Sequence, residues 1–259
     1  MRHFMNRSVL FIIGVICIGS VAFTTLAQAE TLVESNLLFR IYMAFNVDQA
    51  AAQAWLPDPW KAVSLPKGPF KGANLYLILD DRFLNQDAEG KPTMGGTIRL
   101  VAPVVFGKNP QTGAFSAFVA PVYSPLDGPG RFKNNVKATV SREATRKGTN
   151  FEPGAGIEVW KVQDSAGGIL EFRMAYGTAA PKRITKTIKP RSNVEPDLFH
   201  VFRDDSATFL VKSIPAGIDS LKDYKFKVTI SELKKIFSGS EQLIGISVSP
   251  VYMRQQILP

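Results

Sequence analysis

A short basic segment of the chain holds side chains that can bind an anion or attack a carbonyl group. The segment GPGRFKNNVKATV, residues 128–140, contains Arg131, Lys133 and Lys137 and no acid. A lysine ammonium attracts a ligand carboxylate, and a deprotonated lysine forms an imine with a carbonyl carbon. A guanidinium group binds a planar carboxylate through two parallel hydrogen bonds, so Arg131 and the more distant Arg99 are further candidate binding residues.

The order of residue types in this segment predicts that the two lysines share one face of a strand. Successive strand side chains point to opposite faces, so Val136, Ala138 and Val140 would lie on one face. Lys133 and Lys137 would then lie on the other. If this polar face meets solvent, the lysines are surface charges; if it lines a cavity, they converge on a pocket. Both alternatives stay open, because a single bulge would exchange the two faces.

The scarcity of cysteine and histidine excludes several kinds of chemistry. Cys17 is the only cysteine, and His3 and His200 are the only histidines. A chain that starts after residue 29 would therefore lack thiolate nucleophiles, disulfides and multi-histidine zinc sites. His200 lies in the apolar run LFHVF, which favours a half-buried strand residue over the base of a catalytic triad. The sequence predicts no metal site and no cofactor.

Residues 1–29 have the three parts of a cleaved secretory signal peptide. Arg2 and Arg7 form a basic start, residues 9–23 are almost wholly apolar, and residues 27–29 read Ala-Gln-Ala. The apolar run is shorter than the roughly 20 residues that a membrane-spanning helix needs. Cleavage removes two of the 31 basic residues and none of the 22 acids, so the formal charge falls from +9 to +7. We expect a periplasmic or secreted protein that begins at Glu30.

Residues 30–259 are expected to form a single, mainly antiparallel β domain (α+β). Segments 170–177 and 224–230 alternate apolar with polar residues, as half-buried strands do. Segments 73–79, 98–106 and 115–124 are apolar on both faces. Such a strand needs the core on one face and a helix or a lined cavity on the other, and a barrel with outer helices supplies both.

Two short helices and one turn are also predicted. Asp48 is a natural N-cap for residues 49–56, and Ser231 for residues 232–237. The pair Asp80-Asp81 follows an apolar run without further acids at metal-ligand spacing, and is interpreted as the boundary between a strand and a turn.

The basic segment PKRITKTIKPR, residues 181–191, is interpreted as an edge strand that its lysines protect from further pairing. The alternative is contact with an anionic envelope surface. Nucleic acid is not an expected partner, because the segment has no aromatic residues for base stacking and the chain is expected to be exported.

The segment RIYMAFNVDQAAAQAWLPDPW, Arg40 to Trp60, resembles the start of the acetoacetate decarboxylase-like superfamily. In that superfamily a first strand leads to an aspartate, a short alanine-rich helix and a Pro-acid-Pro turn. Asp48, Ala51 and the turn Leu56-Pro57-Asp58-Pro59 follow this order here. The resemblance implies an antiparallel acetoacetate decarboxylase-like β-barrel with a few short outer helices.

The same resemblance places Lys133 near the lysine that forms a Schiff base in the family. A second lysine follows that residue in the family and lowers its pKa, whereas Asn134 follows here. The family also places a glutamate before the strand at residues 98–106, where this chain has Arg99 and no acid. An acid from a distant strand, Glu143, Glu152 or Glu158, could still reach the lumen.

Two functions follow as alternatives. The first is an exported barrel that binds a small organic anion, for example a carboxylate, in its lumen without decarboxylating it, with Lys133, Lys137, Arg131 and Arg99 as binding residues. The second is a lysine-dependent decarboxylase or related carbon-carbon lyase that acts on a keto acid, with Lys133 as the catalytic residue. A purely structural or envelope-binding module, the third possibility, would contain no cavity.

Overall fold

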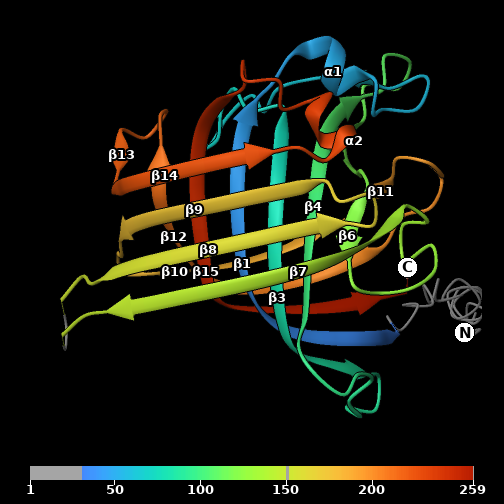
Figure 1. The fold of residues 1–259 in the computed structure, drawn as a ribbon. Helices are drawn as coiled ribbons and strands as arrows, with labels where there is room; N and C mark the ends of the chain where they lie inside the picture. The colour runs from blue at the N-terminus through green and yellow to red at the C-terminus, as the bar shows by residue number, and fades with distance from the viewer. Residues whose placement is uncertain (1–30, 150–151, 259) are drawn as a thin grey trace, which may run out of the picture. The chain divides into compact units, whose positions relative to one another are not determined.

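The computed structural model describes residues 31–149 and 152–258, which form mainly β-strands (Figure 1). Two short helices, α1 (Gln49–Gln53) and α2 (Ser231–Lys234), interrupt them. The strands are β1 (Leu32–Asn46), β2 (Lys61–Ala62), β3 (Leu75–Asp87), β4 (Ile98–Lys108), β5 (Phe115–Val119), β6 (Val122–Ser124), β7 (Asn135–Lys147), β8 (Ala155–Asp164), β9 (Ile169–Gly177), β10 (Lys182–Ile188), β11 (Arg191–Ser192), β12 (Val201–Ser213), β13 (Ile218–Asp219), β14 (Leu221–Val228) and β15 (Gln242–Ile257).

The predicted signal peptide, residues 1–29, lies outside the described residues. Within residues 31–149 and 152–258, neither helix has the length and apolar character that a bilayer crossing requires.

The strands follow one another in the order β10-β12-β15-β1-β3-β4-β6-β7-β8-β9-β14. The two end strands of this path, β10 and β14, do not pair with each other in the described part of the chain, so the sheet is not closed. The mainly β architecture is as predicted. The barrel wall, however, is interrupted.

The first part of the sheet is nevertheless strongly curled. β11 pairs with β5, the neighbour of β4, yet it begins only three residues after β10 ends. Three residues span at most about 11 Å. In a flat sheet the strands from β10 to β5 would separate the two ends by about 29 Å, at roughly 4.8 Å per strand. The strands β10, β12, β15, β1, β3, β4 and β5 must therefore bend around a hollow.

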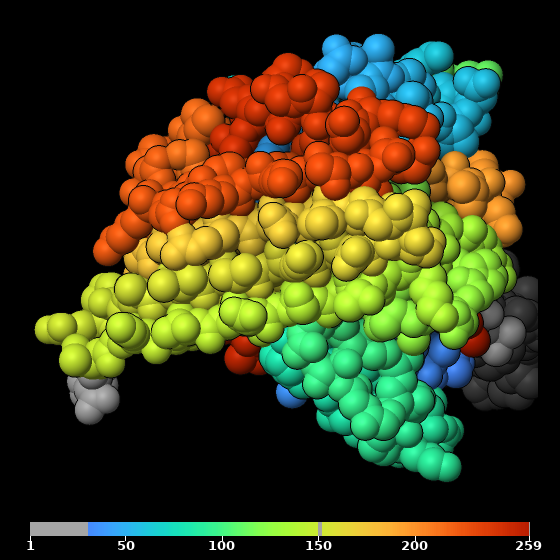
Figure 2. All heavy atoms as spheres, in the orientation of Figure 1, coloured from blue at the N-terminus to red at the C-terminus, as the bar shows by residue number. Residues whose placement is uncertain are grey.

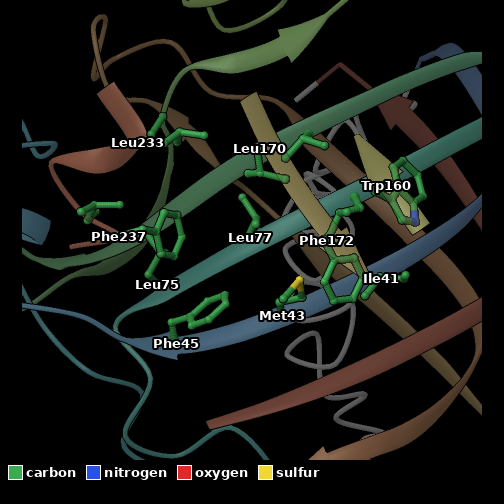
Figure 3. Packing of buried hydrophobic residues seen from close by; sticks show 14 of the residues in the cluster. Ile41, Met43, Phe45, Leu75, Leu77, Trp160, Leu170, Phe172, Leu233 and Phe237 are labelled. Atoms are coloured by element: carbon green, nitrogen blue, oxygen red, sulfur yellow. The ribbon is translucent and has the colours of Figure 1, made fainter. Parts of the chain in front are cut away.

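The strands β7, β8, β9 and β14 form a second layer that crosses the outer face of β1 and β3, and Figure 2 shows them as successive bands over one side of the molecule. The main hydrophobic core lies between the two layers. Trp160 of β8 and Phe172 of β9 are almost fully buried there against β1 and β3. Figure 3 shows this packing, with Ile41, Met43, Phe45, Leu75, Leu77, Leu170, Leu233 and Phe237 around them.

The strands with apolar residues on both faces have the two environments that the sequence predicts. In β3, Leu75, Leu77 and Leu79 point into the main core. Tyr76 and Ile78 point the other way, into a cavity inside the curl. The alternating strands β9 and β14 bury only one face, also as predicted.

One of the two helix caps is as predicted and the other is wrong. Asp48 caps α1, because its side chain accepts a hydrogen bond of 2.9 Å from the amide of Ala51. Ser231 is already the first residue of α2, and Ile230 occupies the capping position without a side-chain hydrogen bond. Ile230 is 2% exposed, so this helix begins at a buried apolar side chain and has no capping side chain.

A candidate anion-binding cavity

A cavity of about 630 Å³ lies inside the curl, which is within the usual range for small-molecule sites. Strands β1, β3, β4, β5, β6, β10, β12 and β15 contribute side chains to its wall, together with the loop at residues 126–134. It lies on the opposite face of β1 and β3 from the main core, because the side chains that line it alternate with those of the core. The purely structural alternative, which requires a solid interior, is therefore wrong.

The strand register gives the cavity a charged end and an apolar end. Arg40 of β1 lies opposite Asp80 of β3, and Arg82 is one cavity-facing position further along β3. In the other direction Ile78 lies opposite Ala102, and Tyr76 opposite Val104. The cavity-facing side chains thus change from charged to apolar along β3. About 20 Å separates the Cα atoms of Arg82 and Tyr76, at roughly 3.4 Å per residue.

Two buried arginine-aspartate pairs form the wall at the charged end. Arg40 donates to both carboxylate oxygens of Asp80, at 2.5 and 2.6 Å. Arg254 of β15 donates to both oxygens of Asp204, at 2.8 and 3.0 Å. Burial opposes ionisation of each carboxylate, but the adjacent guanidinium outweighs it and holds the pKa of both acids below their usual range. Both pairs are therefore ionised at neutral pH.

Arg82 has no such complete pairing. Its Nη2 lies 3.7 Å from Asp80, and its buried Nε has no hydrogen-bond partner among the described residues. Burial lowers the pKa of Arg82 to about 10, and the positive charges of Arg131, Arg254 and Arg40 act in the same direction against the attraction of Asp80. An anion placed in the cavity would relieve this repulsion and supply the missing acceptor.

Three further charges complete this end of the cavity. Arg131 forms an ion pair with Glu34, and both line the cavity. Lys186 of the edge strand β10 has its Nζ 5.2 Å from the centre of the Tyr42 ring. Arg131 and Lys186 together add more positive charge than Glu34 offsets, beside Arg40 and Arg254 in the cavity wall.

Tyr42 is the tyrosine in the most positive surroundings. Its hydroxyl accepts a hydrogen bond of 2.9 Å from Arg40. Burial opposes ionisation of Tyr42, but Arg40, Lys186 and Arg254 outweigh it, so the pKa of Tyr42 is below the ordinary value of 10.0. Burial raises the pKa of each of the other five tyrosines, Tyr76, Tyr123, Tyr176, Tyr224 and Tyr252.

We therefore expect Tyr42 to lose its proton first as the pH rises. Ultraviolet titration of the folded protein should show one tyrosine ionising below about pH 10 and the others above it. Tyr42→Phe should remove the early step, and the control Tyr76→Phe should keep it. An early step of full amplitude in Tyr42→Phe would contradict this assignment.

Of the four site residues predicted from the sequence, Arg131 lines the cavity. Lys133 is exposed on the turn before β7, with φ of 59°, and is not among the described residues that line the cavity. Lys137 of β7 is also exposed and pairs with Asp127 at 2.6 Å, and Arg99 lies 3.2 Å from Asp81. Anion binding by Lys133, Lys137 and Arg99 stays a prediction to which the cavity adds no support.

The two faces of the strand that holds Lys137 are as predicted, but the placement of Lys133 on its polar face is wrong, because Lys133 precedes β7. Ala138 is buried and Val136 and Val140 pack against the main core, whereas Lys137 and Thr139 are exposed. The polar face thus meets solvent, which was the first of the two alternatives. His200 is half-buried, as predicted, but it lies just before β12 and not within a strand, and its Nε2 is 3.1 Å from the carbonyl oxygen of Arg131.

The prediction for Asp80 and Asp81 is wrong. Both lie inside β3 and are at most 3% exposed, on opposite faces. Asp80 faces the cavity, whereas Asp81 accepts a hydrogen bond of 2.8 Å from Arg142, which also binds the fully buried Glu158. Glu158 is buried, but it is not among the described residues that line the cavity, and its carboxylate pairs with Arg142 at 2.8 and 2.9 Å.

Sequence reasoning missed Arg40, Arg82 and Arg254 as cavity residues. The available signal was the presence of arginines and aspartates inside otherwise apolar strands, because buried charges need partners. That signal does not say which arginine meets which aspartate.

No family model matches the sequence, and no curated protein matches it significantly. Among solved structures, the enduracididine biosynthesis enzyme MppR, complexed with the condensation product of pyruvate and imidazole 4-carboxaldehyde, matches with a TM-score of 0.53 and 8% identity over 87% of each chain. MppR complexed with pyruvate matches with a TM-score of 0.52 and 7% identity, over 87% of this chain and 88% of that one. An acetoacetate decarboxylase-like enzyme from Sphingomonas wittichii RW1 matches with a TM-score of 0.51 and 11% identity, over 92% of this chain and 96% of that one. These likenesses confirm the acetoacetate decarboxylase-like fold.

Proposed function

We propose that this chain, with its acetoacetate decarboxylase-like fold, is an exported protein that binds a small organic anion in the cavity and does not decarboxylate it. The excess of positive charge at the cavity is the observation that carries the proposal. The described residues that line it include six cations, Arg40, Arg82, Arg131, Arg254, Lys186 and Lys189, but only two acids, Glu34 and Asp80. Asp204 forms an ion pair with Arg254. With Asp204 included as a third acid, the cations still exceed the acids by three.

Arg82, Arg131 and Lys186 are the proposed anchors for the anion. Arg40 and Arg254 are already bound in two-point contacts with Asp80 and Asp204, so they shape the wall. Arg82 has an unpartnered Nε, and Arg131 could exchange its contact with Glu34 for a ligand carboxylate. The structures of MppR add support of a general kind, because that protein holds pyruvate, a small organic acid, in the same type of fold.

A thermal-shift comparison of anions with neutral analogues tests the proposal. Keto acids and other carboxylates should raise the melting temperature, whereas amides of the same shape should not. At a hundred-fold excess over Kd, the stabilisation is about 2.7 kcal/mol, or roughly 5–10 °C for a domain of this size. Equal shifts with acids and amides, or no shift with any acid, would contradict the proposal.

Borohydride reduction in the presence of pyruvate separates binding from the lysine-dependent alternative. Imine chemistry would attach the reduced substrate to a lysine and raise the mass of its peptide. We expect no adduct on the peptide that contains Lys133, because this side chain is exposed and is not among the described residues that line the cavity. An adduct there, or on Lys186, would favour the enzymatic alternative.

The export part of the proposal is supported by the sequence of residues 1–29 alone. Mass spectrometry of the protein from its producing cell should find a chain that begins at Glu30. Recovery of the full chain from Met1 would remove export from the proposal without affecting the cavity.

A further inference from the structure

The half of the cavity away from Arg82 is almost wholly apolar. Leu100, Ala102, Val104, Phe106 and Val119 are buried and form one hydrophobic cluster. Tyr76, Ile78, Val122 and Phe132 pack against the same cluster and also line the cavity. Water in such a space has few hydrogen-bond partners, so the space favours the apolar part of a ligand.

Asn134 and Ser124, next to this apolar half, use their donors within the protein, although the buried Oδ1 of Asn134 has no hydrogen-bond partner among the described residues. The amide nitrogen of Asn134 donates to the carbonyl oxygens of Val119 and Ala120, at 2.7 and 2.9 Å. The hydroxyl of Ser124 donates to Asn135 at 2.6 Å. A ligand as small and polar as pyruvate would therefore satisfy the arginines but leave most of the 630 Å³ to water.

The charged and apolar halves follow one another along a single direction. Asp80 and Arg82 mark one end of β3 within the cavity, and Tyr76, opposite Val104, marks the other. The Cα atoms of Asp80 and Tyr76 are about 14 Å apart, at roughly 3.4 Å per residue, which is the length of an extended chain of about ten carbon atoms when the van der Waals radii of its two ends are included.

We propose that the ligand is an amphipathic carboxylate, whose head binds Arg82 and Arg131 and whose aliphatic or aromatic body lies along Ile78, Ala102 and Val104. This inference rests on the proposed function and narrows it, because it names the class of anion. The head supplies the acceptor that Arg82 lacks, and the body displaces water from the apolar half.

A homologous series of straight-chain carboxylates, from two to fourteen carbon atoms, tests the inference by isothermal titration calorimetry. The affinity of the full-length mature protein should rise about three- to four-fold per methylene group, and should level off near ten carbon atoms. Straight-chain alcohols of the same length should bind at least ten-fold more weakly, because they lack the charged head.

A matched pair of variants locates the body of the ligand. Ala102→Phe places a ring in the apolar half, and it should lower the affinity for the ten-carbon acid more than ten-fold. Lys225→Gln changes an exposed residue of β14 outside the lining and should leave the whole series unchanged. If Ala102→Phe does not fold, Val104→Ala serves instead, because it enlarges the same half and should shift the best chain length upward.

The outcomes separate this inference from the proposed function. If carboxylates of every length bind with the same affinity, the inference that the ligand has an apolar body is wrong, but the proposed anion site is unaffected. If alcohols bind as well as acids, the inference that a carboxylate head binds Arg82 and Arg131 is wrong. If no carboxylate of any length binds, the proposed function itself fails.

Discussion

Replacing Asp80 with asparagine is expected to lower the free energy of unfolding by about 3–5 kcal/mol, because it leaves the buried guanidinium of Arg40 without its carboxylate. Arg40 and Asp80 are each 1% exposed, so water cannot replace the lost partner. The melting temperature should fall by roughly 6–20 °C for a domain of this size. Differential scanning calorimetry at neutral pH measures this change.

Two further variants show that the cost comes from an uncompensated charge. The double variant Arg40→Met with Asp80→Leu removes both charges together and should recover most of the lost stability, since apolar residues can replace a buried ion pair. Asp205→Asn breaks the exposed pair with Arg183 and should leave the melting temperature unchanged. A similar loss in Asp80→Asn and Asp205→Asn would contradict the distinction between the two pairs.

Replacing Arg82 with glutamine should reduce the affinity for a bound carboxylate by about 10- to 100-fold. A hydrogen bond to a charged group contributes roughly 1.5–3 kcal/mol, and Arg82 supplies the donor that has no partner in the described residues. Equilibrium dialysis with the carboxylate that gives the largest thermal shift measures the change. Lys225→Gln, on the exposed face of β14, is the control and should bind as the unmodified protein does.

The same variant should not destabilise the empty protein. Burial and the neighbouring arginines lower the pKa of Arg82, which means that the folded state already disfavours its charge. Glutamine removes that charge, so the melting temperature without ligand should stay the same or rise. A fall as large as that of Asp80→Asn would show that Arg82 is a structural residue and would remove it from the binding site.

Arg82 and Asp80 thus separate two roles within one charged cluster. Asp80 is needed for stability because its carboxylate accepts two hydrogen bonds from the buried guanidinium of Arg40 and neutralises its charge. Arg82 is incompletely paired, so its buried positive charge is fully compensated only when a ligand supplies a negative charge. We infer that stability and binding can be altered independently at this end of the cavity.

Much of the local structure could be predicted from the sequence alone. Alternation in residues 170–177 and 224–230 predicted strands with one buried face, and β9 and β14 have that pattern. Apolar residues on both faces of 73–79 predicted a second buried environment, which is the cavity. Asp48 predicted the start of α1. These predictions succeed because side-chain direction repeats every two residues in a strand, and because caps act over a few residues.

The chemistry of the cavity was decided only by the tertiary structure. Arg40 and Asp80 are far apart in the chain, as are Asp204 and Arg254, and the strand register places the members of each pair opposite each other. The basic segment around Lys133 drew attention because its charges are adjacent in sequence, yet Lys137 faces solvent there. A strand's polar face can meet water or a cavity with the same residue pattern. The choice depends on how distant strands pair, and here the contact of β11 with β5 curls the sheet so that the arginines of β1, β3 and β15 point inward.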